Sequence, residues 1–187
     1  MIFIFGNGKH SMVIREILYN NKFVQSFNSI PINIDKEDEE KYQHNEQDLL
    51  IHGIGDNRVR KILQTKKYAF GIWPSIIAKD VICNDSVILR PGCQILHKAC
   101  VLTGSVIGEG TIIETGAQID HDCQVGNYCL ISGGVTFGGS VTIGDDTLIG
   151  VGVTICPDIT IGKGCVILDT GPIHKDIPDF TVLRYKD

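Results

Sequence analysis

The residues best suited to chemistry lie around His121, which stands between two carboxylates, Asp120 and Asp122. An adjacent carboxylate orients an imidazole and favours its charged form, which suits a general base working near neutral pH. Gly139 follows eighteen residues later, where a glycine leaves room for a ligand carbonyl to approach a backbone N–H above the imidazole. A base for the nucleophile and a fixed dipole for the oxyanion are what an acyl transfer requires. The alternative, that His121 is an exposed corner residue without a catalytic role, stays open at this point.

The eighteen-residue spacing matters because a six-residue repeat runs through most of the chain. Residues 75–176 divide into seventeen consecutive blocks of six without an insertion, and the third residue of every block is apolar. A period of six is neither helical nor a simple strand alternation, and it predicts a parallel β-helix in which three blocks make one triangular coil. Glycine at the fourth position is expected to ease the corners, where φ can be positive. It occurs there at Gly108, Gly126, Gly138, Gly144, Gly150 and Gly162.

The first 73 residues follow a different pattern, that of alternating strands and helices. Apolar runs at 2–5, 49–54 and 68–72 predict strands, with a weaker one near 23–27 or 30–34. Helices are predicted just after Ser11 and over 58–65. This order predicts a small Rossmann-like α/β domain over 1–73, followed by the β-helix over 74–176 and a C-terminal tail over 177–187.

Two glycine-bearing turns give this first domain a candidate ligand site. One follows the first strand and the other follows the strand 49–54, so both should emerge at the carboxyl edge of one parallel sheet, where ligands bind. The alternative is a tight structural turn in which Ser11 caps the helix. The predicted binding residues are small, polar or cationic: Gly6, Gly8, Lys9, His10, Gly55, Asn57 and Arg60.

Composition excludes several classes of function. A net charge of −5 argues against binding of nucleic-acid phosphates as the main role. The apolar start, residues 1–5, ends at Gly6 and is too short for a signal peptide or a membrane span. Seven cysteines without a secretory signal predict free thiols and a reducing, cytoplasmic location.

A metal site is not expected. His121, Asp122 and Cys123 are adjacent, but the repeat predicts that Cys123 points inward while His121 points outward. The spacings His-x-x-x-His and Cys-x-x-Cys, which often mark zinc or redox sites, do not occur in the sequence. His97 lies in a different column of the coil and is interpreted as a solvated surface histidine.

The chain resembles the NeuD/PglD-type acetyltransferases of bacterial surface-sugar biosynthesis over nearly its whole length. The matching segments are 6–10 (GNGKH), 54–60 (IGDNRVR), 73–75 (WPS), 120–126 (DHDCQVG) and 175–178 (KDIP). The resemblance implies a left-handed β-helix, an exception to the usual right-handed crossover, and a homotrimer with three active sites between subunits.

The resemblance also implies the role of each site residue. His121 would deprotonate the amine of a nucleotide-linked sugar as it attacks the thioester of acetyl-CoA, Asp122 would orient His121, and the Gly139 N–H would stabilise the oxyanion. The N-terminal domain would hold the sugar nucleotide, with Gly8 near the diphosphate and Asp35 facing the base. Acetyl-CoA would lie in the groove between subunits, along cofactor-binding residues Gly139, Val151 and Asp169.

The sequence departs from the family pattern in four places. Leu130 stands where a second histidine is often found, and Glu114 stands where an asparagine is common. The final coil, which is usually rich in glycine and alanine, reads LDTGP at 168–172, and the usual closing Gly-x-Pro-Ala-Lys is absent. The preferred interpretation is an N-acetyltransferase acting on a UDP-linked 4-amino-4,6-dideoxy sugar. The alternatives are O-acetylation of sialic acid or a related sugar, and a non-catalytic scaffold that binds sugar nucleotides.

Overall fold

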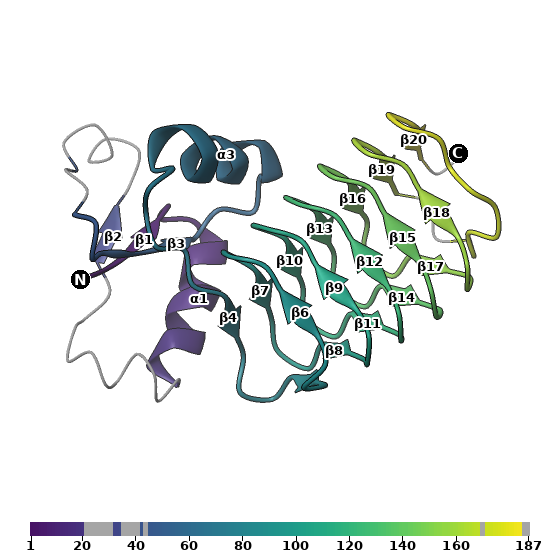
Figure 1. The fold of residues 1–187 in the computed structure, drawn as a ribbon, viewed down its shortest axis with the longest axis horizontal. Helices are drawn as coiled ribbons and strands as arrows, with labels where there is room; N and C mark the ends of the chain where they lie inside the picture. Colours follow the sequence, from purple (N-terminus) through teal and green to yellow (C-terminus); the bar gives the residue numbers. More distant parts are fainter. Residues whose placement is uncertain (21–31, 35–41, 43–44, 169–170, 185–187) are drawn as a thin grey trace.

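The computed structural model describes residues 1–20, 32–34, 42, 45–168 and 171–184. Asp35 and Asp169, both predicted to bind ligands, lie outside the described residues, as does 23–27, one of the two positions predicted for the weak strand. The other position, 30–34, contains β2 (Ile32–Ile34). Two parts are visible in Figure 1: a small N-terminal unit, and a long stack of strands that extends away from it.

The stack of strands is a parallel β-helix, as the repeat predicts. Apart from β20, which follows β19, neighbours in each sheet are three strands apart in sequence, so three six-residue blocks make one coil. The first sheet contains β4 (Ile76–Ile77), β7 (Gln94–Ile95), β10 (Ile112–Ile113), β13 (Leu130–Ile131), β16 (Leu148–Ile149), β19 (Val166–Ile167) and β20 (Val182–Leu183). The second contains β5 (Ile82–Cys83), β8 (Cys100–Val101), β11 (Gln118–Ile119), β14 (Thr136–Phe137) and β17 (Thr154–Ile155). The third contains β6 (Ile88–Leu89), β9 (Val106–Ile107), β12 (Gln124–Val125), β15 (Thr142–Ile143) and β18 (Thr160–Ile161).

The glycines at the fourth position of the blocks are needed for a different reason from the one predicted. Positive φ occurs at the sixth position of the blocks, for example at Gly104 and Gly116, and not at the fourth-position glycines. A Cβ on Gly126 would instead lie 2.6 Å from the backbone nitrogen of Asp145, and one on Gly138 would lie 2.7 Å from Pro157. The fourth-position glycines are therefore explained by close stacking of successive corners, since a Cβ there would collide with the next coil.

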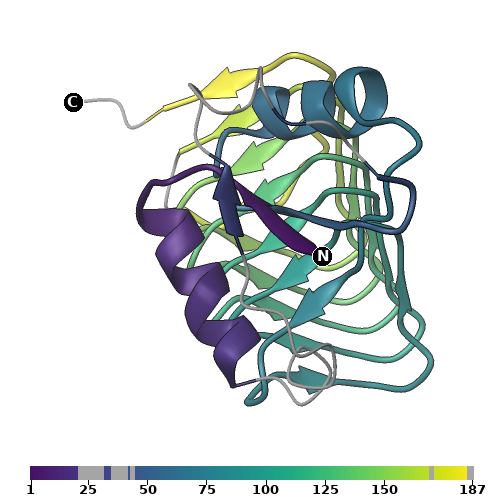
Figure 2. The ribbon, with the colours of Figure 1, turned by 90° about the vertical axis from the view of Figure 1, so that its left-hand side faces the viewer.

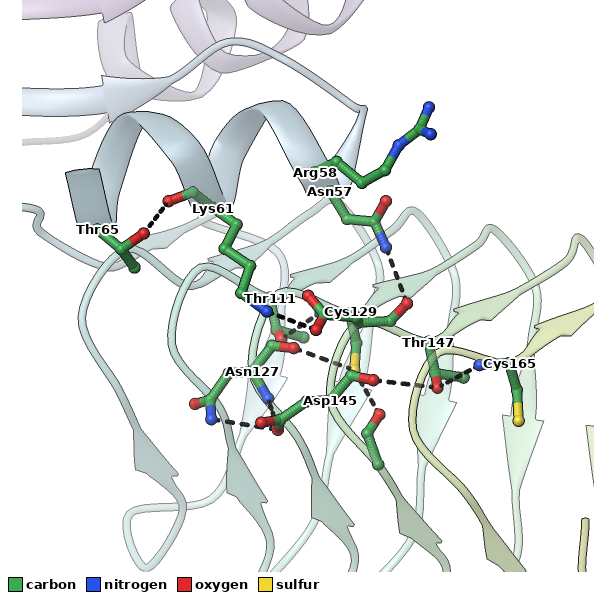
Figure 3. A network of polar contacts seen from close by, with 12 residues as sticks. Asn57, Arg58, Lys61, Thr65, Thr111, Asn127, Cys129, Asp145, Thr147 and Cys165 are labelled. Atoms are coloured by element: carbon green, nitrogen blue, oxygen red, sulfur yellow. Dashed lines mark hydrogen bonds and ion pairs between the residues drawn. The ribbon is translucent and has the colours of Figure 1, made fainter. Parts of the chain in front are cut away.

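The cysteines are free thiols, as predicted, and four of them are buried inside the coil. Cys129 alternates in its column with threonines, and its backbone N–H donates to Thr111 Oγ1 over 2.9 Å. Cys165 does the same to Thr147 over 3.1 Å, as Figure 3 shows. Threonine hydroxyls and cysteine thiols therefore satisfy backbone groups between coils as well as filling space.

The described residues of the N-terminal unit form a three-stranded parallel sheet and two helical segments. The strand order is β2-β1-β3, with β1 at Ile2–Phe5, β2 at Ile32–Ile34 and β3 at Leu49–His52. The helices are α1 (Lys9–Tyr19) and α3 (Asn57–Ile62), the latter continued by a π-helical turn at Leu63–Lys67. The strand predicted at 68–72 is wrong: only an isolated bridge between Leu49 and Ile72 forms there.

This unit shares a hydrophobic core with the outer face of the coil. Side chains of β1, α1 and β3 pack against Ile76, Leu96 and Ile112, which belong to the coil. Figure 2 shows α1 and the small sheet placed against the first coils. The described strands and helices of the N-terminal unit and the β-helix are consequently one packed structure.

The segment predicted as a C-terminal tail extends the coil through the Ile177 bridge and β20. Ile173 pairs with Ile155, eighteen residues earlier, but Ile177 pairs with Ile161, sixteen residues earlier. Two residues are thus missing from the last coil, after which β20 pairs with β19 in the ordinary way. The described part of 177–187 therefore continues the β-helix, and the sequence boundary at 176 marks only this change of register.

No helix among the described residues has the length and apolar character needed to cross a membrane.

Candidate active site

His121 occupies the corner between β11 and β12 and is paired with Asp122. Its Nδ1 lies 2.9 Å from Asp122 Oδ2, while Asp120 Oδ1 accepts the backbone N–H of His121 over 2.7 Å. This geometry decides which of the two flanking carboxylates faces the ring. With Nδ1–H donated to Asp122, Nε2 carries the lone pair and is the nitrogen that can accept a proton.

The carboxylates around His121 make its imidazole more basic. The hydrogen bond to Asp122 raises the pKa of His121, and the negative charges of Asp120 and Asp158 act in the same direction. The side chains of His121 and Asp122 are 53% and 64% exposed, so solvent screens these charges. The site is an accessible base with one oriented nitrogen, consistent with a role in proton transfer.

Gly139 lies directly against the imidazole. A Cβ at this position would be 2.6 Å from both Cε1 and Nε2 of His121. Only glycine at position 139 therefore leaves room for the ring. The Gly139 N–H donates no hydrogen bond to any described residue. The equivalent N–H groups of Gly133 and Lys163 are occupied, by the carboxylates of Glu114 and Asp179 at 3.1 and 3.0 Å. Gly139 therefore presents a free donor beside a free base.

The first glycine turn leads into the start of α1. Gly6 has a φ of +105°, and a Cβ there would be 2.8 Å from Ile54, which explains the glycine. Gly8 is the N-cap residue of α1, so no side chain caps this end of the helix, and the first turn contains no acidic residue. Ser11 does not cap the helix either, because its hydroxyl donates to the Gly8 carbonyl over 2.6 Å. Lys9 is exposed beside it. The helix N-terminus is thus open to an anionic group.

The second glycine turn borders a hollow of about 540 Å³. Gly55 and Asn57 form part of one wall, and Leu130 lies with Leu148 and Val166 on the coil side. Asn57 also ties the turn to the coil, since its Nδ2 donates to the carbonyl of Asp146 over 3.1 Å (Figure 3). The hollow therefore lies between the turn and the outer face of the first sheet.

Arg60 has a structural role that differs from the one predicted. Its side chain is fully buried, and burial lowers the pKa of its guanidinium to about 10. Nε and Nη2 donate to the carbonyls of Gly110 and Cys129, each over 2.9 Å, and Nη1 donates to the carbonyl of Gly55. Arg60 is therefore not a free cation for a substrate, and it connects the second turn to two coils.

His10 is likewise engaged with the coil. Its Nε2 lies 2.8 Å from Gln94 Oε1, and burial lowers its pKa. Gln94 in turn donates from Nε2 to the carbonyl of His52 over 2.6 Å. Since the amide nitrogen is used there, Gln94 Oε1 accepts from His10, which leaves Nδ1 of a neutral His10 as an acceptor.

Sequence reasoning missed His52, which is the most deeply buried histidine near this interface. It is stacked on Trp73 with ring centroids 4.2 Å apart, and its Nε2 lies 2.7 Å from Gln64 Oε1. Burial lowers the pKa of His52 to about 3. A histidine inside the apolar run 49–54, six residues before the helix predicted over 58–65, was the available signal.

Within one chain, the predicted site residues form two separate groups. His121 lies at the corner between the second and third sheets, whereas the hollow beside Gly55 lies over the first sheet. Val151, predicted to lie along the cofactor, is 73% exposed at another corner. Among the described residues no cluster of three or more His, Cys, Asp or Glu side chains could hold a metal ion.

Comparisons with known proteins agree with the repeat and the fold. The family model for the bacterial transferase hexapeptide (six repeats) matches residues 104–139 and 140–168. A comparison with curated proteins gave no match.

Three of the similar solved structures cover almost the whole chain. The acetyltransferase domain of PglB from Neisseria gonorrhoeae, in complex with acetyl coenzyme A, is 27% identical with a TM-score of 0.87, covering 97% of this chain and 94% of that one. A variant of perosamine N-acetyltransferase from Caulobacter crescentus, in complex with CoA and GDP-perosamine, is 25% identical with a TM-score of 0.83 and coverages of 97% and 91%. WeeI from Acinetobacter baumannii, 15% identical with a TM-score of 0.75 and coverages of 99% and 96%, shares the fold.

Together the repeat, the fold and these relatives define the class of protein: an acyltransferase built on a hexapeptide-repeat β-helix. The resemblance to the sugar acetyltransferases, predicted from five short motifs, is confirmed.

Proposed function

We propose that this protein transfers an acetyl group from acetyl-CoA to the amino group of a nucleotide-linked amino sugar. The observation that carries the proposal is the free Nε2 of His121 beside the free N–H of Gly139. Relatives of the same fold that bind CoA or acetyl-CoA, one of them with a nucleotide-linked amino sugar, support the choice of both substrates.

The reaction follows from these two groups. The sugar amine attacks the thioester carbonyl carbon, and Nε2 of His121 accepts the proton that the amine loses. Asp122 stabilises the imidazolium through Nδ1–H. The oxyanion of the tetrahedral intermediate accepts a hydrogen bond from the Gly139 N–H. The C–S bond then breaks, and the CoA thiolate leaves with the proton returned by His121.

The N-terminal unit is the proposed site for the sugar nucleotide. The uncapped start of α1, with Gly6, Gly8 and Lys9, offers backbone N–H groups and a cation to a diphosphate. The hollow at Gly55 and Asn57 offers an aliphatic face to the less polar side of a deoxy sugar or a base. Asp35 is proposed to contact the base. A UDP-linked 4-amino-4,6-dideoxy sugar is the preferred acceptor.

We further propose a homotrimer with a left-handed coil, located in the cytoplasm. The separation of His121 from the hollow within one chain supports an active site made by two subunits, the hollow of one facing His121 of the next. Acetyl-CoA would lie along the exposed Val151 and along Asp169. Sedimentation of the purified protein as a monomer would contradict this arrangement.

The test of substrate class is release of free CoA thiol from acetyl-CoA in the presence of single acceptors. The panel contains UDP- and GDP-linked 4-amino sugars, a UDP-linked 2-amino sugar, sialic acid and CMP-sialic acid. Turnover with a nucleotide-linked amino sugar is expected. Turnover with the sialic acids alone would replace the proposal by O-acetylation, and binding of sugar nucleotides without any turnover would replace it by a non-catalytic role.

A further inference from the structure

The carboxylate of Asp122 is held between two residues of the coil. Its Oδ2 contacts Nδ1 of His121 at 2.9 Å. Its Oδ1 lies over Gly104, which occupies the same corner position one coil earlier, so that a Cβ on Gly104 would collide with this oxygen. The Asp122 carboxylate, which orients the base, therefore has room in this position only because residue 104 is glycine.

Backbone conformation does not by itself require glycine at this position. Gly104 has a φ of +73°, but seven of the described residues other than glycine, Asp122 among them, have a φ between +53° and +61°. Three other corner glycines with positive φ, Gly116, Gly134 and Gly152, would meet nothing within 4 Å if a Cβ were added. Gly104 differs from them because its missing Cβ makes room for a member of the His–Asp pair.

We propose that Gly104 is a positioning residue for the reaction, which seats the Asp122 carboxylate where it can orient the His121 imidazole. The inference rests on the proposed role of His121 as the base. The other atoms of Asp122 near a Cβ at position 104 are Cγ at 3.2 Å and Cα at 3.6 Å. A methyl group there can therefore be accommodated by rotating the Asp122 side chain, with the backbone left in place. That rotation moves the carboxylate away from Nδ1 and leaves the ring without its partner.

The charges that face His121 determine what such a rotation does to the base. Asp122 gives the largest contribution that raises the pKa of His121, followed by Asp120, and Asp158 adds a smaller one. Asp120 and Asp158 remain in place when Asp122 rotates. The imidazole then loses part of its raised basicity and its preferred tautomer, because neither remaining carboxylate bonds to Nδ1.

The experiment compares Gly104→Ala with Gly116→Ala, since φ is +73° and +72° at the two positions and only the first Cβ meets Asp122. NMR titration of the His121 ring, which needs no substrate, is expected to show a lower pKa in Gly104→Ala than in Gly116→Ala and the wild type. With an acceptor, kcat should fall on the order of tenfold in Gly104→Ala, a part of the ~10²–10⁴-fold that a general base contributes, with KM unchanged.

The same comparison in an Asp122→Ala background isolates the pair, because alanine has neither the carboxylate that meets a Cβ at position 104 nor an acceptor for Nδ1–H. There Gly104→Ala should add no further loss in kcat and no further shift in the titration. Equal titration curves and equal kcat for Gly104→Ala and Gly116→Ala would overturn the inference. A lowered pKa in a protein that acetylates no acceptor would support the positioning of Asp122 while contradicting the proposed function.

Discussion

The contact between Gly139 and His121 makes the sharpest prediction about the site. In Gly139→Ala the new Cβ would lie 2.6 Å from Cε1 and Nε2 and 3.2 Å from Nδ1. Carbon atoms in ordinary contact are about 3.5–4.0 Å apart, so the ring has to retreat by about 1 Å. A displacement of this size in a catalytic group costs about 10²-fold in rate. Gly139 has no positive φ, so the substitution adds no backbone strain.

The assay is steady-state release of CoA thiol, accompanied by urea unfolding to show that the fold is retained. Gly133→Ala is the matched control, because Gly133 has the same position in its block and its Cβ would meet only the Thr115 carbonyl, at 3.2 Å. We expect kcat to fall about 10²-fold in Gly139→Ala and to stay within about threefold in Gly133→Ala. In a His121→Ala background, Gly139→Ala should cost far less. A normal kcat for Gly139→Ala would refute the claim that His121 works from the position seen here.

Two further predictions concern stability. Arg60→Ala should lower the free energy of unfolding, measured by urea titration, by about 3 kcal/mol, because it leaves buried carbonyls without a donor. The control is Lys61→Ala, which removes a half-exposed ion pair with Asp146. It should lower the free energy of unfolding by less than about 1 kcal/mol. The pKa of His52 is about 3 in the folded protein and about 6.5 in the unfolded chain. The unfolded state therefore binds more protons as the pH falls below about 6.5. The contribution of His52 to the free energy of unfolding is complete well above about pH 6.5 and is lost as the pH falls. Between pH 6.5 and 5 the contribution of His52 to this loss should be about 1.6 kcal/mol, so the loss should be smaller by that amount in His52→Asn. Equal losses in the variant and the wild type would contradict the neutral, buried state of His52.

The β-helix could be predicted because its repeat is local. Each block needs an apolar third residue and a small first residue, and seventeen uninterrupted blocks leave no other period. The positions of His121 and Gly139 one above the other follow directly from that register. Sequence could not tell whether Asp120 or Asp122 faces the imidazole, because both are adjacent to it and the choice depends on the left-handed backbone of Asp122.

Contacts between the two parts of the chain could not be predicted. Arg60 stands in a motif beside glycines, which suggested a ligand contact, but its acceptors Gly110 and Cys129 are fifty and sixty-nine residues away. The role of the fourth-position glycines was also misread, since the obstacle to a Cβ is the backbone of the next coil and not the local φ. β20 could not be predicted from a fixed period of six, because the last coil is two residues shorter than the others.

The central claim is that His121 is the base of an acetyl transfer. The direct measurement is the rate of CoA thiol release by wild type and His121→Ala, with the best nucleotide-linked amino sugar as acceptor and circular dichroism as a control for folding. The account predicts a folded variant whose kcat is ~10²–10⁴-fold lower. A folded His121→Ala variant that turns over at a near-normal rate would contradict it.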